Sequence, residues 1–140
     1  MITDFNILNK IGFHIIGSAF EVRSMYGRLM LESFYEKVMA IELRLKGHCV
    51  ERQEGLTIRH KNVEIPNAYV GDTIVDNSVV IEYKALPYMN GEEFRQLMTY
   101  LKLSGCGLGY LINFGAKDFS ITKFNGESKI LKGGIYRIIN

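Results

Sequence analysis

The apolar residues in the N-terminal third of the chain recur at helical spacing. Between residues 5 and about 25 they fall three or four positions apart, which predicts a helix with one buried face. Asp4 is placed to cap the start of this helix, and Gly27 is placed to end it. A second helix is expected over residues 30–46, with Gly47 as its C-terminal stop. The residues expected to face inward are Leu8, Ile11, Ile15, Ala19, Val22 and Tyr26 in the first helix, and Leu31, Phe34, Val38, Ile41 and Leu45 in the second.

Beyond residue 47 the apolar positions alternate with polar ones, and a period of two predicts strands. The strands expected here are "CVERQ", "LTIRH", "VEIPNAYVGDTIV" and "VVIEYKAL", with turns at His60-Lys61-Asn62 and Asp76-Asn77-Ser78.

A third helix is expected over residues 91–104, where Asn90 and Glu93 can form a capping box. The apolar run "GLGYLINFG" is typical of a strand covered on both faces, and "FSITKFN" and "GIYRIIN" are further strand candidates. The expected order is αα-ββββ-α-ββ in one domain over residues 1–140. This order predicts an α/β (α+β) fold with a mixed central sheet flanked by helices.

The composition is that of an ordinary globular chain, with 47% hydrophobic residues, 23% charged residues and a net charge of +2. No apolar run is long enough to span a membrane, and the N-terminus does not have the pattern of a signal peptide. Cys49 and Cys106 are expected to be reduced, buried thiols of a cytoplasmic protein. His14, His48 and His60 lack ligand spacing and are expected to be scattered structural or surface residues.

Three charged residues interrupt the apolar segment "GDTIVDNSVVIEYK". If Asn77 is the tip of a hairpin, Asp72 lies opposite Glu82, and Lys84 shares the face of Glu82. Opposed carboxylates repel unless a cation lies between them, and hard ions such as Mg²⁺ bind carboxylate oxygens. A nearby lysine can hold a water or a developing negative charge, so the pattern suits metal-assisted phosphodiester hydrolysis. A solvated hairpin face in which Lys84 neutralises Glu82 explains the same residues equally well.

The spacing D-x9-E-x-K, from Asp72 to Lys84, resembles the core motif of the PD-(D/E)XK nuclease superfamily. The surrounding sequence is similar to the small prokaryotic GxxExxY family within it, over roughly residues 12–115. The segments that carry this likeness are "GSAFEV", "YGRLMLESFY", "AIELRLKG", "VERQ", "QLMTYLKLSG" and "LGYLINFG". The resemblance implies a restriction-endonuclease-like fold and a nuclease that acts on DNA with Mg²⁺ or Mn²⁺.

The resemblance also implies the roles of particular residues. Asp72, Glu82 and the backbone carbonyl of Tyr83 would hold the metal ion, and Lys84 would be catalytic. A helix carboxylate would complete the metal site, and Glu32 is favoured over Glu21 for this role. Gln96 and Tyr100 match a Q-x-x-x-Y element that lies next to the catalytic residues in related nucleases, and with Asp72, Glu82 and Lys84 they are the expected catalytic residues.

The sequence departs from the family pattern at four flanking positions. Arg28 and Leu29 stand where the family has proline and glycine, Val70 replaces an arginine, and Glu93 replaces a histidine. These departures leave room for an alternative, a nucleic-acid-binding or regulatory protein that keeps the fold without turnover. A structural interaction module is a third possibility. The expected partner is a nucleic acid, above all DNA, and no membrane association is expected. The sequence is compatible with a homodimer.

Overall fold

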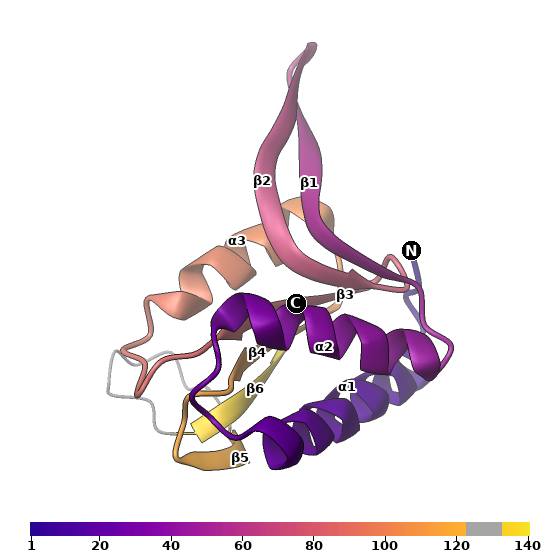
Figure 1. Ribbon diagram of the computed structural model, residues 1–140. Helices are drawn as coiled ribbons and strands as arrows, with labels where there is room; N and C mark the ends of the chain where they lie inside the picture. The colour runs from indigo at the N-terminus through magenta and orange to yellow at the C-terminus, as the bar shows by residue number, and fades with distance from the viewer. Residues whose placement is uncertain (123–132) are drawn as a thin grey trace.

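Three helices flank one mixed sheet in the computed structural model, which describes residues 1–122 and 133–140 apart from the side chains of Glu54 and Asp72 (Figure 1). The elements are α1 (Phe5–Tyr26), α2 (Glu32–Leu45), β1 (Val50–His60), β2 (Val63–Val75), β3 (Val79–Lys84), α3 (Glu93–Ser104), β4 (Leu108–Asn113), β5 (Asp118–Thr122) and β6 (Gly133–Ile139). The expectation of a mixed central sheet flanked by helices is confirmed.

The strands lie in the order β1-β2-β3-β4-β6-β5. β3 runs parallel to β4, with α3 as the crossover between them, and β5 runs parallel to β6, whereas the other neighbours are antiparallel. The described elements follow the order αα-βββ-α-βββ, so the expected order αα-ββββ-α-ββ is wrong. "CVERQ" and "LTIRH" belong to one strand, because Glu54 and Gly55 between them continue the ladder opposite Gly71 and Val70. Residues 123–125 of "FSITKFN" lie outside the described residues.

The first helix forms as its sequence predicts. The side chain of Asp4 accepts a hydrogen bond from the backbone N–H of Asn6 at 2.9 Å, which satisfies one of the free donors at the start of the helix. Gly27 ends the helix with a φ of 74°, a conformation that glycine adopts without a steric penalty. The expected stripe is buried from Leu8 to Val22, and Tyr26 is partly buried against the core.

The second helix presents a different face from the expected one. Leu31 and Leu45 are each 77% exposed, and Ile41 is exposed as well. The residues buried instead are Tyr35, Glu36, Met39, Ala40 and Leu43. Phe34 and Val38 of the expected stripe are half-buried against the core, so that stripe lies at the margin of an inner face centred on Tyr35, Met39 and Leu43.

Tyr35 explains why this face is the buried one. Its ring stacks on Phe114, with 4.3 Å between the ring centroids. Its hydroxyl donates to the carbonyl of Gly27 at 2.6 Å and accepts from the N–H of Met30 at 3.1 Å. Tyr35 therefore ties α2 both to the sheet and to the loop that precedes the helix.

The third helix begins at Glu93 rather than at residue 91, and its N-cap, Glu92, makes no side-chain capping bond. The hydrogen bonds expected of Asn90 and Glu93 form in the turn that leads into the helix. The side chain of Asn90 accepts from the N–H of Glu92 at 3.1 Å, and the N–H of Asn90 donates to the carboxylate of Glu93 at 3.0 Å. Gly105 ends the helix in the left-handed conformation, with a φ of 77°.

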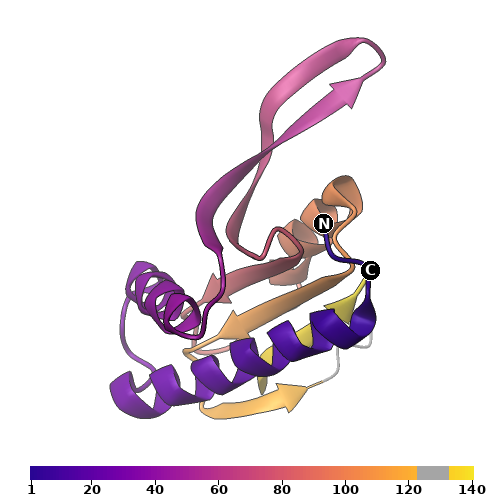
Figure 2. The ribbon, with the colours of Figure 1, turned by 90° about the vertical axis from the view of Figure 1, so that its right-hand side faces the viewer.

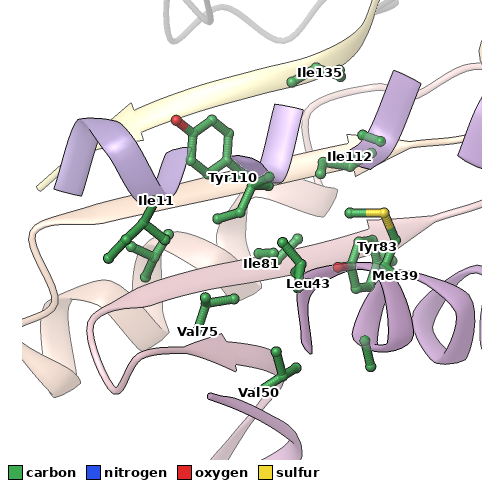
Figure 3. Packing of buried hydrophobic residues seen from close by; sticks show 14 of the residues in the cluster. Ile11, Met39, Leu43, Val50, Val75, Ile81, Tyr83, Tyr110, Ile112 and Ile135 are labelled. Carbon is green, nitrogen blue, oxygen red and sulfur yellow. The ribbon is translucent and has the colours of Figure 1, made fainter. Parts of the chain in front are cut away.

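Two apolar clusters cover the two faces of the sheet. α1 and α2 pack on one face, where Ile11, Met39 and Leu43 meet Ile81 and Tyr83 (Figure 3). α3 packs on the other face. The buried residues of that second cluster are Ile74, Val80, Met89, Phe94, Leu97, Tyr100, Leu101, Cys106, Leu111 and Tyr136. The alternation of β3 therefore sends Ile81 toward α1 and α2, and Val80 toward α3.

β1 and β2 extend far beyond the rest of the sheet as a two-stranded arm, which comprises residues 55–70 (Figures 1 and 2). They pair as far as the predicted turn after His60, with a register shift between Leu56 and Ile58. Every residue of the arm is exposed or half-buried. Because an isolated hairpin of this kind is only marginally stable, the arm depends on the sheet at its base.

The thiols and histidines differ in part from the expectations. Cys106 is buried, but Cys49 is exposed. His14 and His48 are in contact, with 2.7 Å between ring nitrogens, and His48 contacts the carboxylate of Asp76 at 2.6 Å. This chain of side chains links α1 to the segment before β1 and to the β2–β3 turn, so these two histidines are not scattered. None of the described helices is both long and apolar enough to cross a membrane.

A close approach of α1 to the sheet provides a test of the packing. Gly12 faces Tyr110, and a Cβ at this position would overlap the tyrosine hydroxyl and lie 3.1 Å from Cζ. Burial raises the pKa of Tyr110 above its ordinary value, although a hydrogen bond and the charge of Arg137 partly offset this rise. The tyrosine therefore remains a neutral phenol that the helix has to accommodate.

We expect Gly12→Ala to lower the free energy of unfolding by about 1–3 kcal/mol through overpacking, as measured by urea denaturation. The matched control is Gly17→Ala on the same helix, where a Cβ would meet nothing within 4 Å. This control should be neutral or stabilising by about 1 kcal/mol. Tyr110→Phe should relieve part of the Gly12→Ala defect. Equal effects of the two alanine substitutions would contradict the packing described here.

Candidate active site

The candidate site lies where β2 parts from β3, a place that we call the fork. Two successive residues with positive φ, Asp76 and Asn77, form the turn between the strands, as in a type I′ turn. The pairing runs from Val75 opposite Val79 to Thr73 opposite Ile81, which is the register predicted with Asn77 at the tip. In the described ladder β2 and β3 do not pair at Gly71 and Val70, because β2 continues into the arm.

Asp72 and Glu82 are the next residues on the two strands at the fork. The backbone of Asp72 lies in β2 directly after Thr73, and its side chain lies outside the described part of the structure. Glu82 follows Ile81 in β3 and is 0% exposed. The predicted proximity of the Asp72 and Glu82 carboxylates therefore stays a prediction, whereas the register that leads to it is observed.

Glu82 and Lys84 share one face of β3. They alternate with Ile81 and Tyr83, which belong to the cluster under α1 and α2, so they lie on the face that α3 covers. Lys84, the last residue of the strand, is half-buried. A fully buried acid and a half-buried lysine therefore share the α3 face of β3 at the fork.

Gln96 and Tyr100 approach the fork from α3. The side-chain amide of Gln96 donates to the carbonyl of Val70 at 3.4 Å. Tyr100 is buried, and its ring would lie 3.2 Å from a Cβ built on Gly71. The structure thus brings both residues to the two positions of β2 that immediately precede Asp72.

Glu36 approaches the same level of the sheet from α2. It is a buried acid whose carboxylate accepts from Gln53 at 3.2 Å and from Arg52 at 3.3 Å. Arg52 pairs with Thr73, and Glu54 pairs with Gly71, so Gln53 lies at the level of Asp72. Glu36 is a residue that the sequence analysis missed. Tyr35, Met39 and Leu43 recur every four residues and form a second apolar stripe. Glu36 lies beside this stripe, which is the sequence signal that could have placed Glu36 on the inner face of α2.

Glu32 and Glu21 are the helix carboxylates that the sequence analysis offered for the metal site. Glu32 is exposed in the first turn of α2, directly after a loop whose residues 28–30 line the same surface hollow as residues 85–87, which follow Lys84. The start of α2, and Glu32 with it, therefore lies near the C-terminal end of β3. Glu21 is exposed on α1 and forms an ion pair with Lys46 at 3.2 Å. The structure does not bring Glu21 to the fork.

The donor set at the fork is that of a hard cation. An anionic carboxylate cut off from water requires a cation or hydrogen-bond donors nearby, and the sequence places a second carboxylate one pair away on β2. Oxygen ligands of this type suit Mg²⁺ and Mn²⁺, so the residues fit a divalent ion. Among the side chains that the structure describes, which exclude that of Asp72, no group of three His, Cys, Asp or Glu residues could hold a metal on its own.

Comparisons with known proteins are consistent with this geometry. A family model described as the PD-(D/E)XK nuclease superfamily matches residues 9–124, which include both strands of the fork and the whole of α3. Neither the curated proteins nor the solved structures gave a match.

The interactions of Glu36 lead to a prediction about stability. Glu36→Ala should lower the free energy of unfolding by about 1–2 kcal/mol, because it leaves Arg52 and Gln53 without their carboxylate while Arg52 stays partly solvated. The control is Glu42→Ala on the same helix, whose ion pair with Lys46 spans 3.5 Å near the surface. This control should cost less than about 1 kcal/mol in the same urea titration. A larger loss in the control would show that Glu36 does not hold β1 against α2.

Proposed function

The chain belongs to the PD-(D/E)XK nuclease superfamily, and on this premise we propose that it is a metal-dependent nuclease that hydrolyses phosphodiester bonds of DNA at the fork. The observation that carries the proposal is the fully buried Glu82, two residues before the half-buried Lys84, at the point where β2 and β3 part. The proposal includes the finer assignment to the GxxExxY family, which rests on the segments quoted above.

Four groups are proposed to hold the divalent ion. Asp72 and Glu82 supply carboxylate oxygens, the backbone of Tyr83 supplies a carbonyl oxygen, and Glu32 contributes directly or through a water. The ion, Mg²⁺ or Mn²⁺, would supply Lewis-acid chemistry by lowering the pKa of a bound water and drawing charge from a phosphate oxygen. Glu32 enters because its helix begins beside the segment that follows Lys84.

The remaining residues position the reactants. The ammonium group of Lys84 donates a hydrogen bond to the attacking water and stabilises the negative charge that develops on the phosphate. Gln96 and Tyr100 hold the backbone of β2 beside Asp72, which keeps the carboxylates of the two strands in register. Tyr100 packs inside the α3 cluster, so its ring serves as a fixed wall.

The roles of the charged residues separate in a mutational test. Lys84→Ala should lower the turnover of labelled DNA by about a hundredfold or more and leave metal affinity largely unchanged, because it removes a group that acts in the transition state. Asp72→Asn and Glu82→Gln should instead weaken Mn²⁺ binding in calorimetry, since each removes a charged ligand. Cleavage assays with single- and double-stranded DNA and RNA, with and without Mn²⁺, measure turnover.

Lys102→Ala is the matched control, because Lys102 is an exposed lysine at the far end of α3 and should leave turnover unchanged. Cleavage by Lys84→Ala at the wild-type rate would remove Lys84 from the mechanism. A wild-type protein that binds Mn²⁺ and DNA but cleaves none of the substrates would favour the binding or regulatory role without turnover.

A further inference from the structure

An open groove lies between the base of the arm and the start of α3. It has a volume of about 430 Å³ and is lined by residues 67–70 of β2 and by Glu92, Arg95 and Gln96 of α3. None of these residues other than Gln96 belongs to the centre proposed above. The groove is therefore a separate feature that shares one wall with the fork.

The lining offers the functional groups that recognise a nucleobase. Asn67 and Gln96 carry amides, which both donate and accept hydrogen bonds. Tyr69 presents an aromatic ring that is half-buried against the α3 cluster, so its position is fixed by packing. Arg95 has a side chain that is 78% exposed and forms only a loose pair with Glu92, at 3.8 Å. This arginine is free to bind a phosphate.

The backbone shapes the groove at Asn67. This residue has a positive φ of 51°, and its side chain lies across Gly55 on the neighbouring strand, where any Cβ would collide with it. The backbone conformation of Asn67 and the absence of a side chain at Gly55 therefore fix the position of Asn67 at the edge of the groove.

The groove adjoins the fork along β2. The floor residue Val70 is two positions from Asp72, about 7 Å along a strand, and its carbonyl accepts the hydrogen bond from Gln96. A ligand that occupies the groove thus lies beside the place where the phosphodiester would be cut.

We propose that this groove binds one unpaired nucleotide of the substrate strand, next to the scissile phosphodiester; the proposal rests on the nuclease function proposed above. The base stacks on Tyr69, its edge bonds with the amides of Asn67 and Gln96, and Arg95 binds the adjacent phosphate. A volume in the range of small-molecule sites can accommodate one nucleotide. The charges of the one acidic and the one basic residue in the lining, Glu92 and Arg95, balance. The groove therefore suits a neutral nucleobase better than a continuous charged phosphate backbone.

Binding in EDTA tests this proposal apart from catalysis. Fluorescence anisotropy would compare a labelled single strand, a blunt duplex of the same sequence, and a duplex with one unpaired nucleotide. Wild type should bind both substrates with an unpaired nucleotide about tenfold or more tighter than the blunt duplex. Equal affinity for all three, or tighter binding of the blunt duplex, would overturn the proposal.

Matched substitutions locate the effect. Tyr69→Leu should remove the preference, whereas Tyr69→Phe, which keeps the ring, should retain it. Because Tyr69 also packs on the core, the exposed Arg95 supplies a second test that leaves folding intact. Arg95→Ala should weaken binding of the single strand several-fold, and Lys102→Ala on the same helix should not. Wild-type binding by both Tyr69→Leu and Arg95→Ala would exclude the groove as the site.

The two proposals can fail separately when the same DNAs are then assayed with Mn²⁺. Cleavage of every DNA at one rate by wild type and Tyr69→Leu would overturn the groove while the nuclease function stands. A preference for unpaired nucleotides that depends on Tyr69, without any cleavage, would support the groove and remove the nuclease function.

Discussion

The rest of the structure depends on the division of β2 between two neighbours. Its last residues pair with β3 inside the sheet, and its first residues pair with β1 alone in the arm. In the described ladder the pairing of β2 with β3 ends at Thr73 and Ile81, beyond which β2 runs on with β1. Glu82 and Lys84 follow on β3 at this point, and α2 and α3 supply side chains to the same level from opposite faces. The position of the candidate site is thus set by backbone pairing before any charged group is considered.

The burial of Glu82 is the feature that packing alone does not explain. An apolar residue in its place would extend the α3 cluster, in which its parallel partner Leu111 already lies. A carboxylate at a 0% exposed position lowers stability unless opposite charge or donors accompany it. Proteins retain buried acids at functional sites, where the chemistry of the acid is used. Membership of the nuclease superfamily agrees with this interpretation.

Local signals in the sequence were sufficient for some elements and insufficient for others. Asp4, Gly27 and the Asp76-Asn77 turn act on their own neighbours, so the first helix and the β2–β3 register could be predicted.

α2 carries two apolar stripes, and only contacts with residues far along the chain, such as Phe114, select between them. Glu36 was missed for the same reason. The continuous β1 was not predicted either, because the alternation breaks at Glu54 and Gly55, where the strand leaves the sheet for the arm. Motif resemblance supplied Gln96 and Tyr100, whose positions beside β2 follow from tertiary packing that spacing alone does not give.

The arm also makes part of this molecule modular. Residues 56–68 of the arm contribute no fully buried side chain, and the described clusters lie in the sheet and its helices. Removing one residue from each strand near His60 would shorten the arm and preserve its pairing, and the sheet would keep its buried residues. Hairpin tips of this kind tolerate insertions and deletions far better than packed elements do. The length of the arm can therefore change during evolution in small steps, independently of the fold that supports the fork.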